Sequence, residues 1–546
     1  MRGILTTLMF LGLASSKTPA SDLVEIAARN AKQASEALRR SNVTMHAWLK
    51  RADPVTGLLP RTGENPNWVV RDSAADLYPF MVLASRFTEP PLYHGAMRDI
   101  LRREVLQTTR VGRLSDDLQP GGKGFVYPTV DLDRIIFGSS EYVKDGLVPI
   151  TELLGETPWY HRMRGIASDI IANAPYKSRS GRLPSNSAEI NGNMLQLLSR
   201  LYWKTGDETY LDQVIAIADF YFLEMLPATG YLPVHIWNLE KREAIQSLFV
   251  FSDHGNEIVG GLSEACVLVQ YKRPEKAKQY REPFVRMIDR VLEVGRNADG
   301  VWVTSVEVPS GKVSDARHAH CWGYMFNAIY TAWMITGDEK YRDAVRHAIA
   351  GVTRKPAYLF DETGAGRKWG SNAYSDSIEG ALVLLNRLPN PQTDEALDVA
   401  VRKFFDRQRP DGIIEDWYGD GNFIRTSLMY AFRKTQGAYV MPWNTGVHVG
   451  AVSDGGGVLL YLSTERAWTG RLYFDYPRHR DHWNLAVNYP RLNEWPEWFT
   501  VEHDRPYRVQ VGDSAPVVYL GADLVSGLRL SLPSDGQVVV QVSRGK

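Results

Sequence analysis

The sequence predicts a mainly α-helical protein: an (α/α)6 toroid of six or seven helical hairpins, followed by a C-terminal antiparallel β-sandwich. Three observations predict this fold. A helical hairpin recurs along most of the chain, apolar and amphipathic helices alternate within it, and short strands replace helices near the end. The expected divisions are a signal peptide over residues 1–20, the toroid over residues 21–440 and the β-sandwich over residues 441–546.

The N-terminus has the composition of a signal peptide. Residues 1–21 read MRGILTTLMFLGLASSKTPAS, with a basic residue near the start, a short apolar run and then small residues. The apolar run is too short to span a bilayer, and no later segment approaches a spanning helix. We therefore expect a secreted or periplasmic protein without a membrane span.

Two segments of the chain are near copies of each other. Residues 201–222 (LYWKTGDETYLDQVIAIADFYF) and residues 330–351 (YTAWMITGDEKYRDAVRHAIAG) pass from an apolar helix end through TGDExY into an amphipathic helix. The glycine suits a helix C-terminus, and the acidic pair suits the start of the next helix. Looser copies over residues 153–171, 271–291 and 387–407 indicate a repeat architecture.

The two helices of each repeat differ in character. The first is rich in Gly, Ala and aromatic residues, as in residues 75–85 and 320–335, whereas the second has a charged face. An apolar helix paired with an amphipathic one predicts an inner ring surrounded by an outer ring. About seven pairs fit between residues 22 and 436, and six are favoured if the first pair is irregular.

After about residue 440 the pattern changes to short strands separated by Gly, Pro, Asp and Asn. No flexible linker precedes this block, so it should pack against the toroid. Six to eight strands of this kind predict an antiparallel β-sandwich. The expected strands are GGGVLLYLS, GRLYFDYPR, WNLAVNY, YRVQVG, PVVYLG, GLRLSLP and QVVVQVS.

Composition narrows the class of partner. The chain has 63 basic and 63 acidic residues, and this balance argues against nucleic acid or an anionic membrane surface. Its 15 Trp and 26 Tyr suit a cleft that stacks against sugar rings. Cys266 and Cys321 lie in apolar helical sequence, where buried free thiols are expected. No metal or cofactor motif is present, so we expect neither.

Polar residues gather where the predicted inner helices begin, and in a toroid these entrances share one end of the cavity. A single Ser or Asp there is explained as an N-cap, which contributes about 1 kcal/mol. Seven entrances carrying carboxylates, aromatic side chains and Arg exceed what capping needs, and they predict a carbohydrate pocket. The entrances are residues 69–79, 137–149, 183–195, 251–265, 313–327, 369–382 and 413–430.

Five carboxylates at these entrances are the candidate catalytic residues. Asp253 and Glu257 have i,i+4 spacing, and Asp376 and Glu379 have i,i+3 spacing, so each pair can share one helix face. Like-charged neighbours raise one pKa, which suits a general acid beside a base. Glu189 lies among asparagines that can bind sugar hydroxyls. We expect Glu189, Asp253 and Glu257 first, then Asp376 and Glu379.

Other residues at the entrances are candidates for binding substrate through stacking, hydrogen bonds or a guanidinium–carboxylate pair. His318 and His320 are two apart, so on a helix they face different directions and make a poor zinc pair. Arg134 and Arg425 also lie at entrances, where an ion pair with a neighbouring acid is the alternative. The substrate-binding candidates are Arg71, Asp72, Asn191, His254, Arg317, His318, His320, Trp322, Tyr324 and Trp369.

These features together resemble a known family. The TGDxxY hairpins, the entrances RDSAADLYP and DHGNEIVGG, and a β-rich tail containing YLSTERAWTGRLYFDYP resemble the six-hairpin glycosidase superfamily. The order of toroid and β-domain is most similar to the bacterial β-glucuronidases of glycoside hydrolase family 154. The more distant β-L-arabinofuranosidases use a Cys-and-Glu zinc site, for which this chain lacks the cysteines. The resemblance implies removal of a terminal uronic acid from a plant, algal or other acidic glycan.

Three functions remain open at this point. The leading hypothesis is a glycoside hydrolase with a carboxylic acid and a second carboxylate acting on an oligosaccharide or polysaccharide. The second is a polysaccharide lyase, in which His254, His318 or Tyr324 removes a proton while Asn191 or Arg317 neutralises charge. The third is a non-catalytic glycan-binding protein. An epimerase or isomerase is a further alternative, since fold alone does not settle function.

Overall fold

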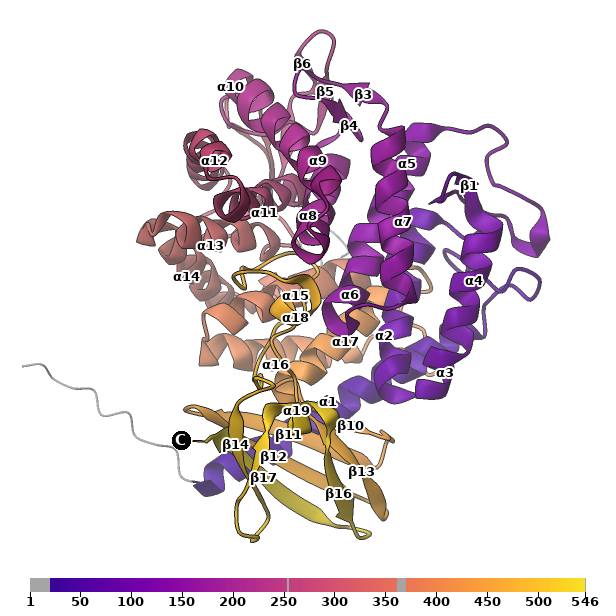
Figure 1. Cartoon of the computed structure of the whole chain (residues 1–546), viewed down its shortest axis with the longest axis vertical. Helices are drawn as coiled ribbons and strands as arrows, with labels where there is room; N and C mark the ends of the chain where they lie inside the picture. The colour runs from indigo at the N-terminus through magenta and orange to yellow at the C-terminus, as the bar shows by residue number, and fades with distance from the viewer. Residues whose placement is uncertain (1–19, 253–254, 361–369, 546) are drawn as a thin grey trace, which may run out of the picture.

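The computed structural model describes residues 20–252, 255–360 and 370–545 (Figure 1). Within that part of the chain, seven helical segments contact one another in a closed ring. The seven inner segments are η1–α2 (Val70–Leu77 and Tyr78–Thr88), α5–η3–α6 (Leu132–Glu141, Tyr142–Leu147 and Val148–Leu154), α8 (Ala188–Thr205), α11 (Gly255–Lys272), α13 (Tyr324–Thr336), α15 (Ser371–Arg387) and α17 (Asp420–Thr435).

Each inner segment packs against an outer helix. The first helix, α1 (Ala20–Leu49), packs along the last inner helix and so closes the ring. The described ring therefore contains seven hairpins, the larger of the two predicted numbers. The other outer helices are α4 (Ala96–Thr108, preceded by the short α3, Pro90–His94), α7 (Pro158–Asn173), α9 (Glu208–Asp219, continued by η4, Phe220–Met225, and α10, Leu226–Ala228), α12 (Pro274–Val294), α14 (Glu339–Arg354) and α16 (Pro391–Phe405).

The TGDExY segments turn the chain as predicted. Gly206 ends α8 with φ 69°, and Gly337 ends α13 with φ 74°, the left-handed conformation that glycine adopts without strain. Asp207 and Asp338 then cap the outer helices by accepting a backbone N–H. The same local pattern, a left-handed glycine followed by an Asp N-cap, therefore makes the turn in two of the hairpins.

Short strands interrupt the helical repeat at several entrances, which the sequence did not predict. The largest insertion is a three-stranded sheet of β7 (Leu248–Val250), β8 (Val303–Glu307) and β9 (Val313–His318). The entrance over residues 313–318 is thus a strand. The remaining small pairs are β1–β2 (Thr109–Val111 and Leu114–Ser115), β3–β4 (Tyr176–Lys177 and Arg182–Leu183) and β5–β6 (Ile236–Asn238 and Glu243–Gln246).

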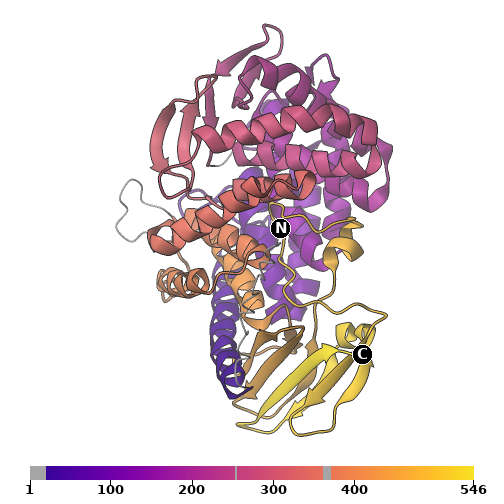
Figure 2. The same cartoon turned by 90° about the vertical axis from the view of Figure 1, so that its left-hand side faces the viewer.

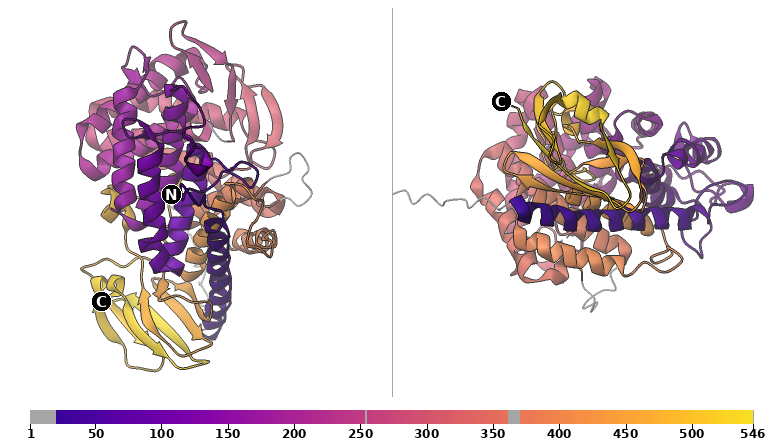
Figure 3. Two further views of the ribbon diagram at one scale, coloured as in Figure 1. Left: turned by 90° about the vertical axis from the view of Figure 1, so that its right-hand side faces the viewer. Right: turned by 90° about the horizontal axis from the view of Figure 1, so that it is seen from below.

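The C-terminal region forms two antiparallel sheets that share one hydrophobic core, separate from the core of the ring. α1 lies along the larger sheet (Figure 3), and Gly450 permits this because a Cβ there would lie 2.1 Å from the Ala31 nitrogen. The smaller sheet is β10 (Tyr439–Met441), β13 (Trp468–Tyr473) and β16 (Leu528–Leu532). The larger is β11 (Val447–Asp454), β12 (Gly457–Thr464), β17 (Gln537–Arg544), β14 (Pro506–Val511) and β15 (Val517–Leu520), with α19 (Gly521–Ser526) between β15 and β16.

One expected strand, WNLAVNY, is not a strand. It begins at the end of α18 (Arg478–Trp483) and continues as an extended segment, residues 484–498, which we call the strap. Figure 2 shows this part of the chain rising from the sheets along the helical ring. Trp483 and Tyr489 are buried in the core of the ring. The apolar side chains of this segment are buried against helices of the ring, so the segment does not pair with another strand as its apolar alternation predicted.

Buried ion pairs fasten the strap to the ring. Arg491 Nε lies 2.8 Å from Glu152 Oε1, and Arg387 Nη2 lies 3.1 Å from Glu494 Oε1. Arg200 Nη2 donates to the Leu492 carbonyl oxygen at 2.8 Å, so the strap backbone is held too. These contacts place the strap across the interior of the ring.

Two further expectations concern membranes and thiols. None of the helices in residues 20–252, 255–360 and 370–545 is both long and apolar enough to cross a membrane. The signal peptide prediction falls on residues outside these ranges. Cys266 and Cys321 are buried and not joined in a disulfide, as predicted, and burial raises the pKa of Cys266 above its ordinary value.

Candidate active site

A cavity of about 310 Å³, here called the funnel, opens at the end of the ring where the inner segments begin. All of the seven inner segments contribute to its wall, as the polar entrances predicted. Its described lining holds seven carboxylates and four cations, so acids exceed bases by three. The lining residues are Arg61, Arg71, Asp72, Asp76, Phe137, Glu141, Lys144, Asp145, Glu189, Glu257, Tyr324, Asn372, Asp376, Tyr418, Asn422, Arg425, Leu492 and Asn493.

Several predicted site residues lie in or beside this funnel. Glu379 is fully buried directly behind the wall, where it accepts a hydrogen bond from the Tyr324 hydroxyl at 2.6 Å. His320 Nε2 lies 3.5 Å from Asp376 Oδ2, so it too supports the wall. The predicted residues that line the funnel are Arg71, Asp72, Glu189, Glu257, Tyr324 and Asp376.

Four predicted binding residues lie elsewhere, and that expectation was wrong for them. Asn191 is fully buried and donates to the Ser185 carbonyl oxygen at 2.8 Å. Trp322 is a buried core residue. Arg317 and His318 lie on β9, because the chain enters α13 from a strand instead of from a helical turn.

Arg317 is exposed on that strand and forms an ion pair with Asp315 at 2.5 Å. The ring of His318 packs edge-to-face on Tyr358. Three other candidates, Asp253, His254 and Trp369, lie outside the described residues.

Three acids and one lysine that line the funnel were not among the predicted site residues. Asp76 lies in the entrance over residues 69–79, and Glu141, Lys144 and Asp145 lie in the entrance over residues 137–149. The signal that the sequence offered was three charged residues, Glu141, Lys144 and Asp145, within an otherwise apolar helix. Arg134, in contrast, pairs with the buried Asp116 and serves the structure.

Both entrances adopt π-helical turns, in η1 and η3, and these two segments contact each other. A π turn widens the helix by one residue and occurs frequently at functional sites. Gly146 permits the close contact, because a Cβ there would lie 2.7 Å from Pro79 Cγ. The local geometry thus turns Asp76, Glu141 and Asp145 toward one cavity.

Lys144 connects two acids across the funnel. Its Nζ lies 2.8 Å from Asp145 Oδ1 and 3.1 Å from Glu257 Oε1. Burial alone would lower the pKa of Lys144, but Asp145, Glu257 and Glu141 raise it well above its ordinary value. The ammonium therefore stays charged and offsets part of the acidic excess.

For two neighbouring acids, Glu141 and Asp76, the described residues form no ion pair, and the charges of Lys144 and Arg425 offset the rise in pKa only in part. Burial, together with the charges of Asp145 and Glu189, raises the pKa of Glu141 well above its usual range. Burial, with Asp145 and then Asp72, raises the pKa of Asp76 in the same way. Carboxyls with a raised pKa therefore lie beside ion-paired carboxylates in one cavity, and a raised pKa favours the protonated form that a general acid needs.

A second cluster forms the opposite wall. Arg425 Nη2 lies 2.7 Å from Asp376 Oδ1 and 2.8 Å from Glu379 Oε2. The Tyr324 hydroxyl lies 2.9 Å from the same Asp376 oxygen. Burial and the two carboxylates raise the pKa of Tyr324 well above its ordinary value, so its hydroxyl is a hydrogen-bond donor.

The mouth of the funnel carries the accessible positive charge. Arg61 pairs directly with Asp72, whereas the nearest approach of Arg71 to Asp72 is 3.6 Å. The side chain of Arg71 is 50% exposed, against 6% for both Lys144 and Arg425. Arg71 can therefore bind an anionic group of an incoming molecule with little disturbance to the wall.

Comparisons with known proteins give weak structural likeness only. No family model matches the chain, and no curated protein matches it. A cellobiose 2-epimerase from Spirochaeta thermophila DSM 6192 superposes with a TM-score of 0.46 at 14% identity, covering 70% of this chain and 99% of its own.

Two glycoside hydrolases give similar values. An α-1,6-mannanase, GH76A of Salegentibacter sp. HEL1_6, superposes with a TM-score of 0.43 at 10% identity, covering 72% of this chain and 98% of its own. A family 76 glycoside hydrolase from a bovine Bacteroides thetaiotaomicron strain has a TM-score of 0.42 at 12% identity, over 73% of this chain and 78% of its own. Likeness at this level assigns no activity.

Proposed function

We propose that the protein is a glycoside hydrolase whose active site is the funnel. The observation that carries this proposal is the juxtaposition of Glu141, whose pKa is raised, with Glu257, which is ion-paired to Lys144. Glycoside hydrolysis needs one protonated carboxyl and one carboxylate facing the same bond. In this assignment Glu141 protonates the leaving oxygen, and Glu257 acts at the anomeric carbon directly or through a water molecule.

The substrate proposed is a glycan that ends in a uronic acid. Arg71 at the mouth is the exposed cation that can pair with the sugar carboxylate. The acidic interior beyond it disfavours a second negative charge, so one terminal uronic acid fits better than a polyanionic segment. Both points agree with the β-glucuronidase activity that the sequence resemblance implies, and the signal peptide composition favours a secreted or periplasmic location.

The lyase alternative loses most of its proposed residues. Arg317 and Asn191 are engaged away from the funnel, and His318 lies on β9. Tyr324 is in place, but its raised pKa opposes the phenolate that would abstract a proton. β-Elimination therefore has less support in the described residues than hydrolysis.

The test uses aryl β-D-glucuronides with leaving groups of different acidity. We expect Glu141→Gln to lower kcat/KM at least about 100-fold with phenyl glucuronide, because the leaving phenolate then departs unprotonated. With a dinitrophenyl leaving group, which needs no proton, the loss should become small. Glu257→Gln should stay impaired with both substrates.

Glu275→Gln is the matched control, since Glu275 is exposed on α12 and pairs with Lys278. It should keep wild-type rates with every substrate. If the wild type releases an unsaturated sugar, the hydrolase assignment is wrong. Sugar binding without turnover, unaffected by either Glu substitution, would instead show a glycan-binding protein.

A further inference from the structure

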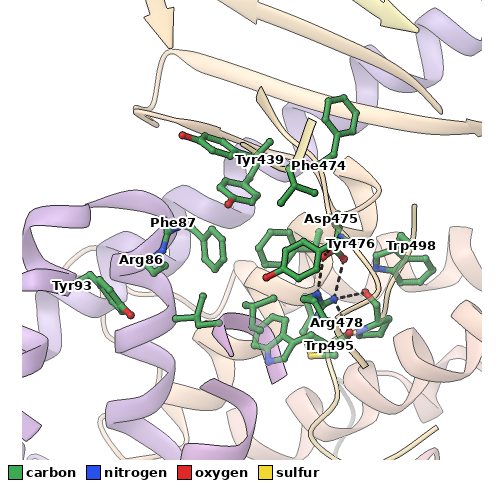
Figure 4. A pocket seen from close by; sticks show the side chains of 18 residues that line it. Arg86, Phe87, Tyr93, Tyr439, Phe474, Asp475, Tyr476, Arg478, Trp495 and Trp498 are labelled. Atoms are coloured by element: carbon green, nitrogen blue, oxygen red, sulfur yellow. Dashed lines mark hydrogen bonds and ion pairs between the residues drawn. The ribbon is translucent and has the colours of Figure 1, made fainter. Parts of the chain in front are cut away.

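A second cavity, of about 320 Å³, lies at the opposite end of the ring from the funnel. It is lined by the C-terminal ends of α2, α6 and α17, by the smaller C-terminal sheet and by the strap (Figure 4). We propose that this basal pocket binds an acidic sugar, as a second site distinct from the funnel. The residues that carry the proposal are Arg86, Tyr439, Tyr473, Tyr476 and Trp498.

Arg86 supplies the charge. Its Nη1 lies 3.2 Å from the Met441 sulfur, a weak acceptor, and its guanidinium lies 5.7 Å from the centroid of the Phe87 ring. Among the described residues, no carboxylate lies within ion-pair distance of Arg86. The guanidinium also lies beside the Tyr439 hydroxyl, and its other N–H groups are available to an incoming carboxylate, which a guanidinium binds in bidentate fashion.

The other charges of the basal pocket cancel. Arg478 binds Asp475 through two contacts, of 2.8 Å and 3.1 Å, and also donates to the Trp495 carbonyl oxygen at 2.9 Å. Figure 4 shows this network on one side of the pocket and Arg86 on the other. Arg86 therefore gives the described lining one net positive charge, which selects an anion.

Aromatic rings form much of the remaining wall, and they are already fixed in place. Tyr439 and Tyr473 stack with ring centroids 4.9 Å apart and an interplanar angle of 7°. Trp498 has the Arg433 guanidinium 4.6 Å from its ring centroid. Aromatic faces of this kind bind the C–H faces of sugars, and fixed rings lower the entropy cost of binding.

Tyr476 is oriented through a chain of hydrogen bonds. Burial lowers the pKa of His482 to about 4, so its ring is neutral at neutral pH. His482 Nδ1 donates to the Glu152 carbonyl oxygen at 2.9 Å, which leaves Nε2 to accept from the Tyr476 hydroxyl at 2.7 Å. The Tyr476 oxygen is thereby left as an acceptor for a sugar hydroxyl.

These observations favour one class of ligand. Volume and mixed lining match a small-molecule pocket, the guanidinium requires an anion, and the rings and the tyrosine oxygen suit a polyhydroxylated ring. A uronic acid combines all three properties. It can arrive as the free sugar or as the end of a glycan, and both forms present the same carboxylate and ring.

The test measures binding by isothermal titration to the full chain carrying Arg71→Ala, which removes the anion partner in the funnel. The probes are D-glucuronic acid, a disaccharide with terminal glucuronic acid, and D-glucose as the neutral control. We expect binding of at least one acidic probe and a Kd at least about 10-fold weaker for D-glucose. Adding Arg86→Gln should abolish the preference for the acid, while Arg102→Gln, an exposed arginine on α4, should leave it intact.

Binding of both acidic probes indicates recognition of the sugar alone, whereas binding of the disaccharide only indicates a glycan end. Trp498→Ala provides a second variant in case Arg86→Gln lowers the melting temperature. It should raise the Kd of both acidic probes. Equal Kd values with and without Arg86, or no binding by the Arg71→Ala protein, would overturn the proposal. D-Glucuronic acid has no glycosidic bond to hydrolyse, so the dependence of its Kd on Arg86 tests the basal pocket separately from the funnel assignment.

Discussion

At the residue scale, partners decide what each carboxyl in the funnel can do. Glu141 and Glu257 are the same residue type in the same cavity, yet one has a raised pKa and the other has an ammonium 3.1 Å away. The ion pair with Lys144, more than the position in the cavity, therefore gives Glu257 a different role from Glu141. The same principle makes Tyr324 a donor, because two carboxylates surround its hydroxyl.

Arg71 provides a test of substrate charge. Arg71→Ala should raise KM for an aryl glucuronide about 10-fold or more, because the sugar carboxylate loses its cation. The rate with the matching aryl glucoside should hardly change. Steady-state kinetics on both substrates measure the difference, and Arg102→Gln is the exposed control.

If Arg71→Ala raised KM for the neutral glucoside by the same factor, a role in carboxylate recognition would be contradicted. It would show that Arg71 supports the wall, for example through Asp72, from which it is 3.6 Å away.

Sequence reasoning predicted six of the 18 described residues that line the funnel. Glu189, Glu257 and Asp376 were predicted because polar residues at helix starts share one end of a ring. Glu141 and Asp76 were missed because their significance depends on a π turn and on neighbours from other helices. Neither the π turn nor these neighbours can be read from one chain segment; the charges of Glu141, Lys144 and Asp145 mark only the place.

At the element scale, α8 and α11 pack closely against each other in the ring, and glycine makes this contact possible. A Cβ on Gly192 would lie 2.4 Å from the backbone carbon of Glu257, and one on Gly261 would lie 2.7 Å from the Gly192 oxygen. This contact fixes the position of Glu257 along the axis of the funnel. Close packing of the two backbones thus sets the position of Glu257, the proposed carboxylate.

Gly192→Ala should destabilise the protein by about 1–3 kcal/mol, because the added methyl group forces the two helices apart. The activity should fall further than the loss of folded protein explains, since Glu257 shifts with the helix. Urea denaturation and kinetics on the folded fraction measure the two effects.

Gly260→Ala is the control on the partner helix α11, where the added Cβ would meet Leu492 at an ordinary 3.7 Å. It should be neutral or slightly stabilising. Equal behaviour of the two alanine variants would contradict the close-packing account.

His482 gives a prediction of pH dependence. Its pKa falls from about 6.5 in the unfolded chain to about 4 in the fold. The unfolded state therefore binds the extra proton first, so the free energy of unfolding falls as pH drops from 6.5 toward 4, by about 3 kcal/mol in all. Urea denaturation across this range measures the slope.

His482→Gln should remove this part of the slope, whereas His161→Gln, at an exposed position on α7, should leave it unchanged. A slope that persists in His482→Gln would assign the acid sensitivity to other groups.

The hairpins show what sequence can predict about elements. TGDExY predicted the turns because Gly and Asp act locally, through φ and through one hydrogen bond. The strand β9 was missed, and with it the positions of Arg317 and His318, because its partner β8 precedes it across a turn that the helical pattern obscured. The seventh hairpin was ambiguous because α1 joins it from the far end of the chain.

At the scale of the whole molecule, the strap joins the two domains and touches both cavities. Leu492 and Asn493 line the funnel, while Trp495 and Trp498 line the basal pocket. Asn493 Nδ2 donates to Asp145 Oδ1 at 3.0 Å, so the C-terminal region helps to position an acid of the proposed active site. No pattern in the sequence predicts this crossing, because the segment resembles a strand.

Glu152 anchors the strap, with Arg491 and Arg200 both paired to its carboxylate. Glu152→Ala leaves both buried guanidinium groups without this partner, and we expect a loss of roughly 3–5 kcal/mol in the free energy of unfolding. Chemical denaturation measures it. The control Glu156→Ala removes an exposed acid nearby and should cost less than about 0.5 kcal/mol; equal losses would contradict the anchoring role.

The most direct test of the central claim compares Glu141→Gln with the wild type on glucuronides of rising leaving-group acidity. The account predicts release of glucuronic acid by the wild type, a loss of at least about 100-fold in the variant with phenyl glucuronide, and near-complete recovery with a dinitrophenyl leaving group. A variant that hydrolyses phenyl glucuronide at the wild-type rate, or one equally impaired with both leaving groups, would contradict the role of Glu141 as the general acid.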